Sequence, residues 1–115
     1  MSHSSFIAFE EYLRSEKRAS EKTIVAYRTE LQRWASFLEA EYEVTPEKAV
    51  RAHAKRLIVW RSKQGISNRS INRTLSALRS YYKWCERTGR PNNDPLGSIK
   101  SLKDHKRVVM SIPQK

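Results

Sequence analysis

Residues 67–85, SNRSINRTLSALRSYYKWC, combine cationic and small polar side chains without one acidic residue. An ordinary exposed helix mixes both signs of charge, because Glu–Lys pairs one turn apart stabilise it. Guanidinium and ammonium groups neutralise phosphates, and short hydroxyl and amide side chains between them let a helix approach a phosphate backbone closely. The chemistry that this stretch indicates is therefore the binding of a polyanion.

The net charge of the whole chain indicates the same kind of partner. The 115 residues carry a formal net charge of +11. Residues 1–50 hold 7 Lys/Arg against 9 Asp/Glu, whereas residues 51–115 hold 16 Lys/Arg against 3 acids, Glu86, Asp94 and Asp104. Solubility needs only a few charges and no segregation. We therefore expect a polyanionic partner, with nucleic acid favoured over an anionic membrane surface.

Side chains typical of catalytic and metal sites are isolated in this sequence. His3, His53 and His105 have no partner at metal-ligand spacing, and the single cysteine, Cys85, excludes an internal disulfide and a Cys-rich zinc site. Cys85 is expected to be a buried core residue. The chain has no Gly-rich phosphate loop and no Ser-His-Asp pattern. We expect no catalytic residue, no metal and no cofactor.

No apolar run approaches the roughly 18–20 residues of a membrane span, and no charged-then-apolar leader opens the chain. The single cysteine fits a reducing compartment. We therefore expect a soluble, cytoplasmic protein with no membrane partner, and the length of 115 residues indicates one domain.

Four segments show the apolar spacing of amphipathic helices, and none reads as a strand. The first, about 5–17, has an apolar stripe of Phe6, Phe9, Tyr12 and Leu13. The second begins after the N-cap Ser20, and its apolar face is Ile24, Tyr27, Leu31, Trp34, Ala35 and Leu38.

The third helix is expected to begin at Pro46, with Thr45 as its cap, and to end at Gly65. Its expected inner face is Val50, Ala54, Leu57, Ile58 and Trp60. The fourth begins after the cap Ser67 and ends at Gly89, with an apolar stripe of Ile71, Leu75, Leu78, Tyr82 and Cys85. Residues 95–102 are a candidate for one further helical turn. Short helices with short connections predict a small all-α bundle of four to five helices.

At about 100° per residue, the cationic side chains of the fourth helix lie opposite its apolar stripe. This face holds Arg69, Arg73, Ser76, Ser80, Lys83 and Arg87, with Asn72 and Arg79 on one flank. Arg and Asn are also the side chains that read base edges in the major groove. A solvated face is the plainer interpretation, but it gains nothing from excluding acids.

The second helix places Lys22, Ala26, Thr29, Arg33 and Ser36 opposite its core face. Glu30 and Glu39 are expected at the side, so an ordinary exposed face explains this helix as well as a binding face does. Arg28 is expected to extend over the apolar flank or to pair with an acid. The three tryptophans are expected in the core or in domain contacts, and Trp84 and the tail are candidates for partner contacts.

The stretch ISNRSINRTLSALRSYYKWCERTGRPNNDPL resembles the corresponding helix of tyrosine recombinases, the phage integrases and Xer-type resolvases. Their N-terminal core-binding domain has Ser/Thr-Ile-Asn-Arg, Leu-Ser-Ala-Leu-Arg, an aromatic pair and a Gly followed by Asn-Pro. The segment SEKTIVAYRTELQRWASFL is similar to that family's Ser-x-x-Thr-x-x-x-Tyr-Arg-x-x-Leu pattern. The resemblance covers about residues 6–100 and departs from the family pattern at the turn RPNNDP.

The resemblance implies a SAM-like core-binding domain over residues 1–102, followed by a linker over 103–115, and a clamp on one side of duplex DNA. The second and fourth helices would face the DNA. Matching positions imply DNA contacts at Lys22, Thr23, Ala26, Thr29, Arg33, Arg69, Ser70, Asn72, Arg73, Ser76 and Lys83. Tyr27 lies on the apolar face and is expected to be structural.

The family's chemistry uses a tyrosine nucleophile and a His-x-x-Arg motif on a separate domain. No His-x-x-Arg occurs here, and none of the five tyrosines has that setting. We therefore expect an N-terminal fragment of a site-specific recombinase that cannot itself cut or join DNA. Its expected partners are double-stranded DNA, the catalytic domain of the same parent chain and other recombinase subunits on the DNA.

Two other functions remain open from the sequence. The chain would alternatively be a free-standing helical DNA-binding regulator, or an adaptor that docks an acidic protein. RNA binding is less favoured, because a helix with a basic face fits the major groove of B-form DNA better than the deep, narrow groove of RNA.

Overall fold

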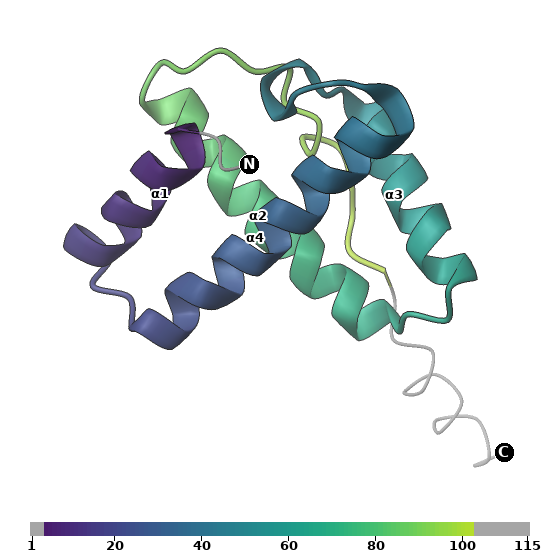
Figure 1. Ribbon diagram of the computed structural model, residues 1–115, viewed down its shortest axis with the longest axis horizontal. Coiled ribbons are helices and arrows are strands. Elements are labelled where there is room, and N and C mark those ends of the chain that lie inside the picture. The colour runs from purple at the N-terminus through teal and green to yellow at the C-terminus, as the bar shows by residue number, and fades with distance from the viewer. Residues whose placement is uncertain (1–3, 103–115) are drawn as a thin grey trace, which may run out of the picture.

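Within residues 4–102, four α-helices follow one another (Figure 1): α1 (Ser4–Ser15), α2 (Glu21–Tyr42), α3 (Arg51–Lys63) and α4 (Asn68–Arg87). A short 3-10 turn, η1 (Pro46–Lys48), lies between α2 and α3. The computed structural model describes residues 4–102, and these include no strand. The prediction of a small all-α bundle is confirmed. None of the described helices is long and apolar enough to cross a membrane.

The expected helix ends are confirmed at four positions. The hydroxyl oxygens of Ser20 and Ser67 accept hydrogen bonds from backbone N–H groups three residues on, each at 3.2 Å, and so cap α2 and α4. Gly65 and Gly89 follow α3 and α4 with φ of 84° and 78°. Residues other than glycine rarely adopt this left-handed backbone conformation, and a residue in this conformation ends the helix.

The predicted start of the third helix is wrong. Pro46 opens only the single turn η1, and α3 begins five residues later, after the extended residues Ala49 and Val50. The cause is tertiary: the Tyr82 hydroxyl donates to the Pro46 carbonyl oxygen at 2.6 Å, and Ala49 is fully buried in the core. Val50, expected on the inner face, is instead exposed at the helix start, where its backbone N–H donates to Nδ1 of His53.

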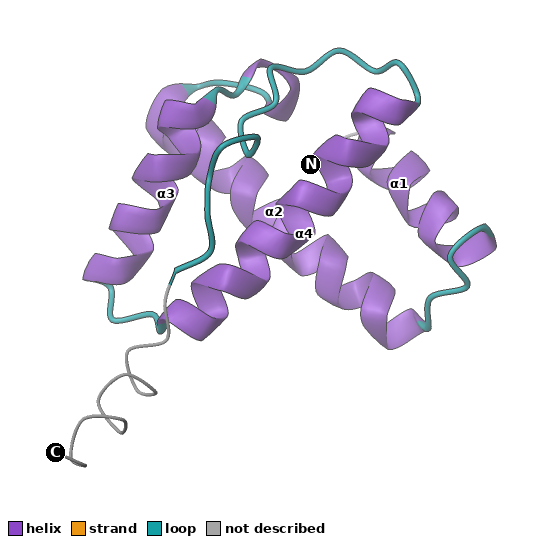
Figure 2. Cartoon of the chain, turned by 180° about the vertical axis from the view of Figure 1, so that it is seen from behind, coloured by secondary structure: helices purple, strands orange, loops and turns teal. Residues whose placement is uncertain are grey.

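The core forms where α2 and α4 cross, which both views show (Figures 1 and 2). The predicted apolar stripe of α4 is buried along its whole length. Trp34 on α2 is fully buried, and its indole N–H donates to the Tyr82 hydroxyl at 2.9 Å. α1 packs on the C-terminal half of α4. There the ring centroid of Phe9 lies 5.5 and 5.3 Å from the ring centroids of Tyr81 and Trp84.

Trp84 and Trp60 differ in their exposure to solvent. Trp84 is only 4% exposed, and the Arg90 guanidinium lies over its ring at 4.4 Å. It is a core residue, so its expected role in partner contacts is wrong. Trp60 is 40% exposed and packs its ring against Phe37 at 5.2 Å, so it lies at the edge of the core. The tail that we paired with Trp84 lies outside the described residues.

Residues 90–102 return as a loop between α3 and α4 (Figure 2). The expected helical turn is a hydrogen-bonded turn without a helix, in which the N–H of Ile99 donates to the carbonyl of Leu96. Both of these side chains are buried. The amide of Asn72 both donates to the carbonyl and accepts from the N–H of Leu102, at 2.8 and 2.7 Å. The loop is thus fastened to α4 at its last described residue.

Candidate nucleic-acid interface

The N-terminal halves of α2 and α4 diverge from the crossing toward the same side of the molecule (Figure 1). Three hollows lie along these helices. Two of them share Ala26, Glu30 and Arg73, and the third meets its neighbour at Tyr27. We call these three hollows together the α2–α4 groove.

Eight of the eleven sequence-predicted contact residues line the α2–α4 groove: Thr23, Ala26, Thr29, Arg33, Ser70, Arg73, Ser76 and Lys83. Four of them come from α2 and four from α4. Side chains from the two faces that the sequence treats separately therefore line the same hollows.

The remaining three predicted contacts differ from one another. Lys22 and Arg69 are exposed near the helix starts, outside these hollows. Asn72 is half-buried, and both ends of its amide are engaged by Leu102. The structure thus gives Asn72 a structural role, which the sequence alone did not indicate.

Several cations in or beside the α2–α4 groove have no partner among the described residues. The side chains of Arg69, Arg73 and Lys83 are exposed, and none forms an ion pair or hydrogen bond with another residue of the described range 4–102. Ala26 and Ser76 lie between them as small residues. A phosphate backbone can therefore approach the helices closely and meet uncompensated positive charge.

A buried polar network underlies the groove, and sequence reasoning missed it. Glu30, expected at the exposed side of α2, is only 7% exposed. Its Oε1 accepts from the Thr74 hydroxyl at 2.6 Å and from Arg33 Nη1 at 3.1 Å. Arg61 Nη1 donates to the same Thr74 hydroxyl oxygen at 2.7 Å and lies 3.9 Å from the Glu30 carboxylate.

This network ties α2, α3 and α4 together by one residue from each helix and Arg33 beside them. Burial, and after it the neighbouring Arg33, lowers the pKa of Arg61, while Glu30 acts in the opposite direction. The one available signal was position: Glu30 precedes the core residue Leu31 and lies one turn from Trp34. A period of 3.6 residues places it at the border of the apolar face.

Arg28 confirms its predicted pairing with an acid. Its Nε and Nη2 donate to the two carboxylate oxygens of Glu10 on α1, each at 2.9 Å. This bidentate pair links α1 to α2. Hydrogen bonding to Glu10 raises the pKa of Arg28. Arg28 is thus part of the scaffold beside the groove.

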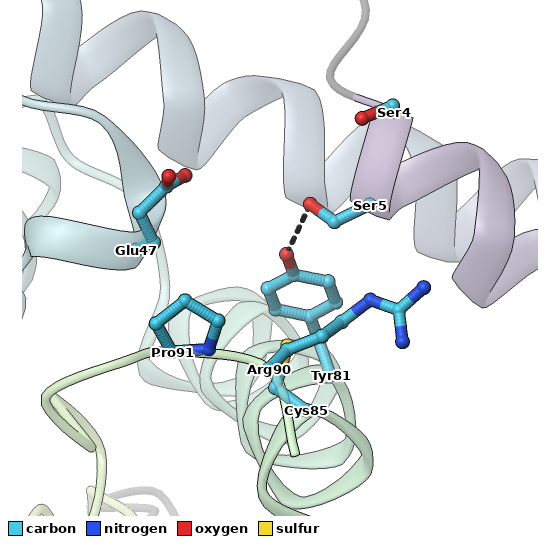
Figure 3. Close-up of a pocket in the computed structure, with 7 residues that line it drawn as sticks. All are labelled: Ser4, Ser5, Glu47, Tyr81, Cys85, Arg90 and Pro91. Carbon is cyan, nitrogen blue, oxygen red and sulfur yellow. Dashed lines mark hydrogen bonds between the residues drawn. The ribbon is translucent and has the colours of Figure 1, made fainter. Parts of the chain in front are cut away.

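A separate small hollow lies at the C-terminal half of α4, lined by Ser5, Tyr81, Cys85 and Arg90 among others (Figure 3). The Ser5 and Tyr81 hydroxyl oxygens are 2.7 Å apart. Burial raises the pKa of the Cys85 thiol and of the Tyr81 hydroxyl, so both stay protonated at neutral pH. Neither group is poised as a nucleophile.

His53, the one histidine within the described residues, accepts the Val50 N–H and packs on the Tyr42 ring at 4.7 Å. Across residues 4–102, no three His, Cys, Asp or Glu side chains gather in a way that would hold a metal ion.

The described part of the chain is a helical bundle with a groove between α2 and α4, and the comparisons with known proteins give its family. The sequence-family model described as the phage integrase N-terminal SAM-like domain matches residues 6–89, and the chain belongs to this family. The resemblance found in the sequence is thereby confirmed.

Its relatives include tyrosine recombinases named XerC. The protein from Azotobacter vinelandii is 34% identical over 105 residues, covering 91% of this chain and 35% of the relative. The one from Neisseria meningitidis is 33% identical over 95 residues (83% and 32%), and the one from Bacillus subtilis 31% over 107 residues (93% and 35%). The chain spans about a third of the length of these curated relatives. No solved structure matches it significantly.

Proposed function

We propose that this domain binds double-stranded DNA sequence-selectively, as the core-binding part of a site-specific tyrosine recombinase. One observation carries the proposal: the cationic faces of α2 and α4 line a single groove. Cutting and joining of DNA would belong to a catalytic domain of the same parent chain. Further recombinase subunits on the DNA would be its other partners.

Phosphate contacts would supply most of the affinity. Arg73 and Lys83 lie on the α4 side of the groove, and Thr29 and Arg33 lie opposite on α2. Each neutralised phosphate makes the logarithm of the binding constant fall by roughly 0.9 per log unit of salt. A steep salt dependence is therefore the first expected property.

Base recognition would come mainly from arginines on the exposed face of α4. Arg69 and Arg73 are free of partners within the described part of the chain, and arginine reads guanine through two parallel hydrogen bonds. Asn72 would have to release Leu102 before its amide reached a base. We therefore assign it to holding the loop rather than to reading the sequence.

The test is a titration of a labelled duplex by fluorescence anisotropy, with Arg73→Glu compared with Arg56→Glu. Arg56 is exposed on α3, outside the groove, so both variants change the net charge equally. We expect Arg73→Glu to abolish measurable binding and Arg56→Glu to weaken it slightly. Wild-type affinity in Arg73→Glu would show that the assigned face is wrong.

Sequence selectivity needs a separate experiment, since the target site is unknown. Selection from a random duplex library would yield an enriched motif if the domain reads bases. Binding without enrichment would remove selectivity from the proposal and leave DNA binding. Binding to an acidic peptide but to no duplex would favour the adaptor, and preference for an A-form RNA duplex would favour RNA binding.

A further inference from the structure

A hollow of about 340 Å³ lies between α2, α3 and α4, at the end of the groove near the start of α4. Its lining includes three guanidinium groups, those of Arg33, Arg61 and Arg73, and one carboxylate, that of Glu30. These four charged groups sum to +2. We call this cavity the arginine hollow.

The charge of the arginine hollow is partly buried. The Arg61 side chain is 7% exposed, and a guanidinium carries five N–H donors. Within residues 4–102, only its Nη1 has an acceptor, the Thr74 hydroxyl. The nearest carboxylate oxygen, Glu30 Oε1, is 3.9 Å away and already accepts from Thr74 and Arg33.

A purely structural ion pair would need one arginine for one carboxylate. Here one carboxylate serves two arginines, and the third, Arg73, has no partner among the described residues. Among the described residues, no fully buried side-chain nitrogen or oxygen lacks a hydrogen-bond partner, so the remaining Arg61 N–H groups face the open hollow, where an anion can replace water as their acceptor. A tetrahedral oxyanion supplies several acceptors at once, and arginine forks bind phosphate oxygens in pairs.

We propose that the arginine hollow is a phosphate-binding site that receives one phosphodiester of the DNA backbone. Arg61 is its buried donor, and Arg33 and Arg73 close on the phosphate from the two sides of the groove. Glu30 and Thr74 hold the Arg61 guanidinium in place from behind. The inference rests on the proposed function and adds α3 to the helices that contact DNA.

The experiment compares Arg61→Met with Arg56→Met in the same duplex titration at several salt concentrations. Both variants lose one positive charge from α3, but Arg56 is exposed and outside the hollow. We expect Arg61→Met to bind about tenfold more weakly and to lower the salt slope by about one. Arg56→Met should keep the wild-type slope.

A scan with neutral methylphosphonate groups, placed singly along the selected duplex, identifies the bound phosphate. At one position we expect the methylphosphonate to weaken the duplex affinity of the wild type about tenfold and to leave the affinity of Arg61→Met unchanged. Equal losses in both proteins at every position would overturn the inference. If the wild type bound no duplex at all, the proposed function itself would fail.

Thermal unfolding checks that Arg61→Met is folded. If it is not, Arg33→Gln and Arg73→Gln, both at exposed positions, test the same hollow, because each should become insensitive to the same methylphosphonate. Inorganic phosphate, titrated while the arginine side-chain N–H signals are followed by NMR, distinguishes the source of the ligand. Saturable shifts of the Arg61 signal with inorganic phosphate would indicate a free-phosphate site, and shifts with duplex alone a backbone site.

Discussion

Replacing Thr74 by valine removes one hydroxyl group and keeps the shape of a fully buried side chain. Two hydrogen bonds to charged groups are lost, one to Glu30 at 2.6 Å and one from Arg61 at 2.7 Å. Such bonds contribute about 1.5–3 kcal/mol each. Glu30 keeps its bond from Arg33, and the new methyl group contributes about 0.8 kcal/mol by burial. We therefore expect a net loss of about 2–5 kcal/mol in the free energy of unfolding.

For a domain of this size, that loss lowers the melting temperature by about 10–30 °C. The measurement is thermal and urea unfolding followed by circular dichroism. Thr29→Val is the matched control, because Thr29 is exposed on α2 and its hydroxyl donates only to the Val25 carbonyl. It should change stability by no more than about 0.5 kcal/mol. If Thr74→Val were as stable as the control, the network would not hold the three helices together and the reasoning would be refuted.

Three further predictions concern other parts of the scaffold. Burial raises the pKa of Tyr82, so the unfolded chain releases the phenol proton before the folded chain does as the pH rises above 10.0. The free energy of unfolding should then fall by up to about 1.4 kcal/mol per pH unit. Urea unfolding at increasing alkaline pH measures this fall, and a flat profile would contradict it. Asn72→Ala should speed hydrogen exchange at the Leu102 amide without changing exchange in α2; unchanged exchange would show that the loop is held by other contacts. A double-mutant cycle of Arg28→Ala and Glu10→Ala should give a coupling of about 0.5–1 kcal/mol, because the arginine is partly exposed, and zero coupling would remove the pair from the scaffold.

Much of the fold could be predicted because it depends on local regularities. The apolar stripe of α4 repeats at helical spacing, and the serines and glycines at helix ends act on their own backbone. The pairing of Arg28 with an acid was also expected, since a long cation beside an apolar flank has few other ways to be satisfied.

The errors fall where a distant residue decides the outcome. The turn at Pro46 depends on Tyr82, which lies 36 positions later in the sequence. The period along α2 places Glu30 only at the border of the apolar face, and the partners that accompany its burial, Arg61 and Thr74, come from two other helices. The cationic face of each helix could be assigned from the sequence. That the two faces line the same hollows depends on how α2 and α4 cross, which the sequence does not give.

The clasp between Asn72 and Leu102 joins the return loop to the helix that would lie deepest against the duplex. While both hydrogen bonds hold, a rotation of α4 about its own axis moves Leu102 with it. The position of Leu102, the last described residue, is therefore coupled to the orientation of α4.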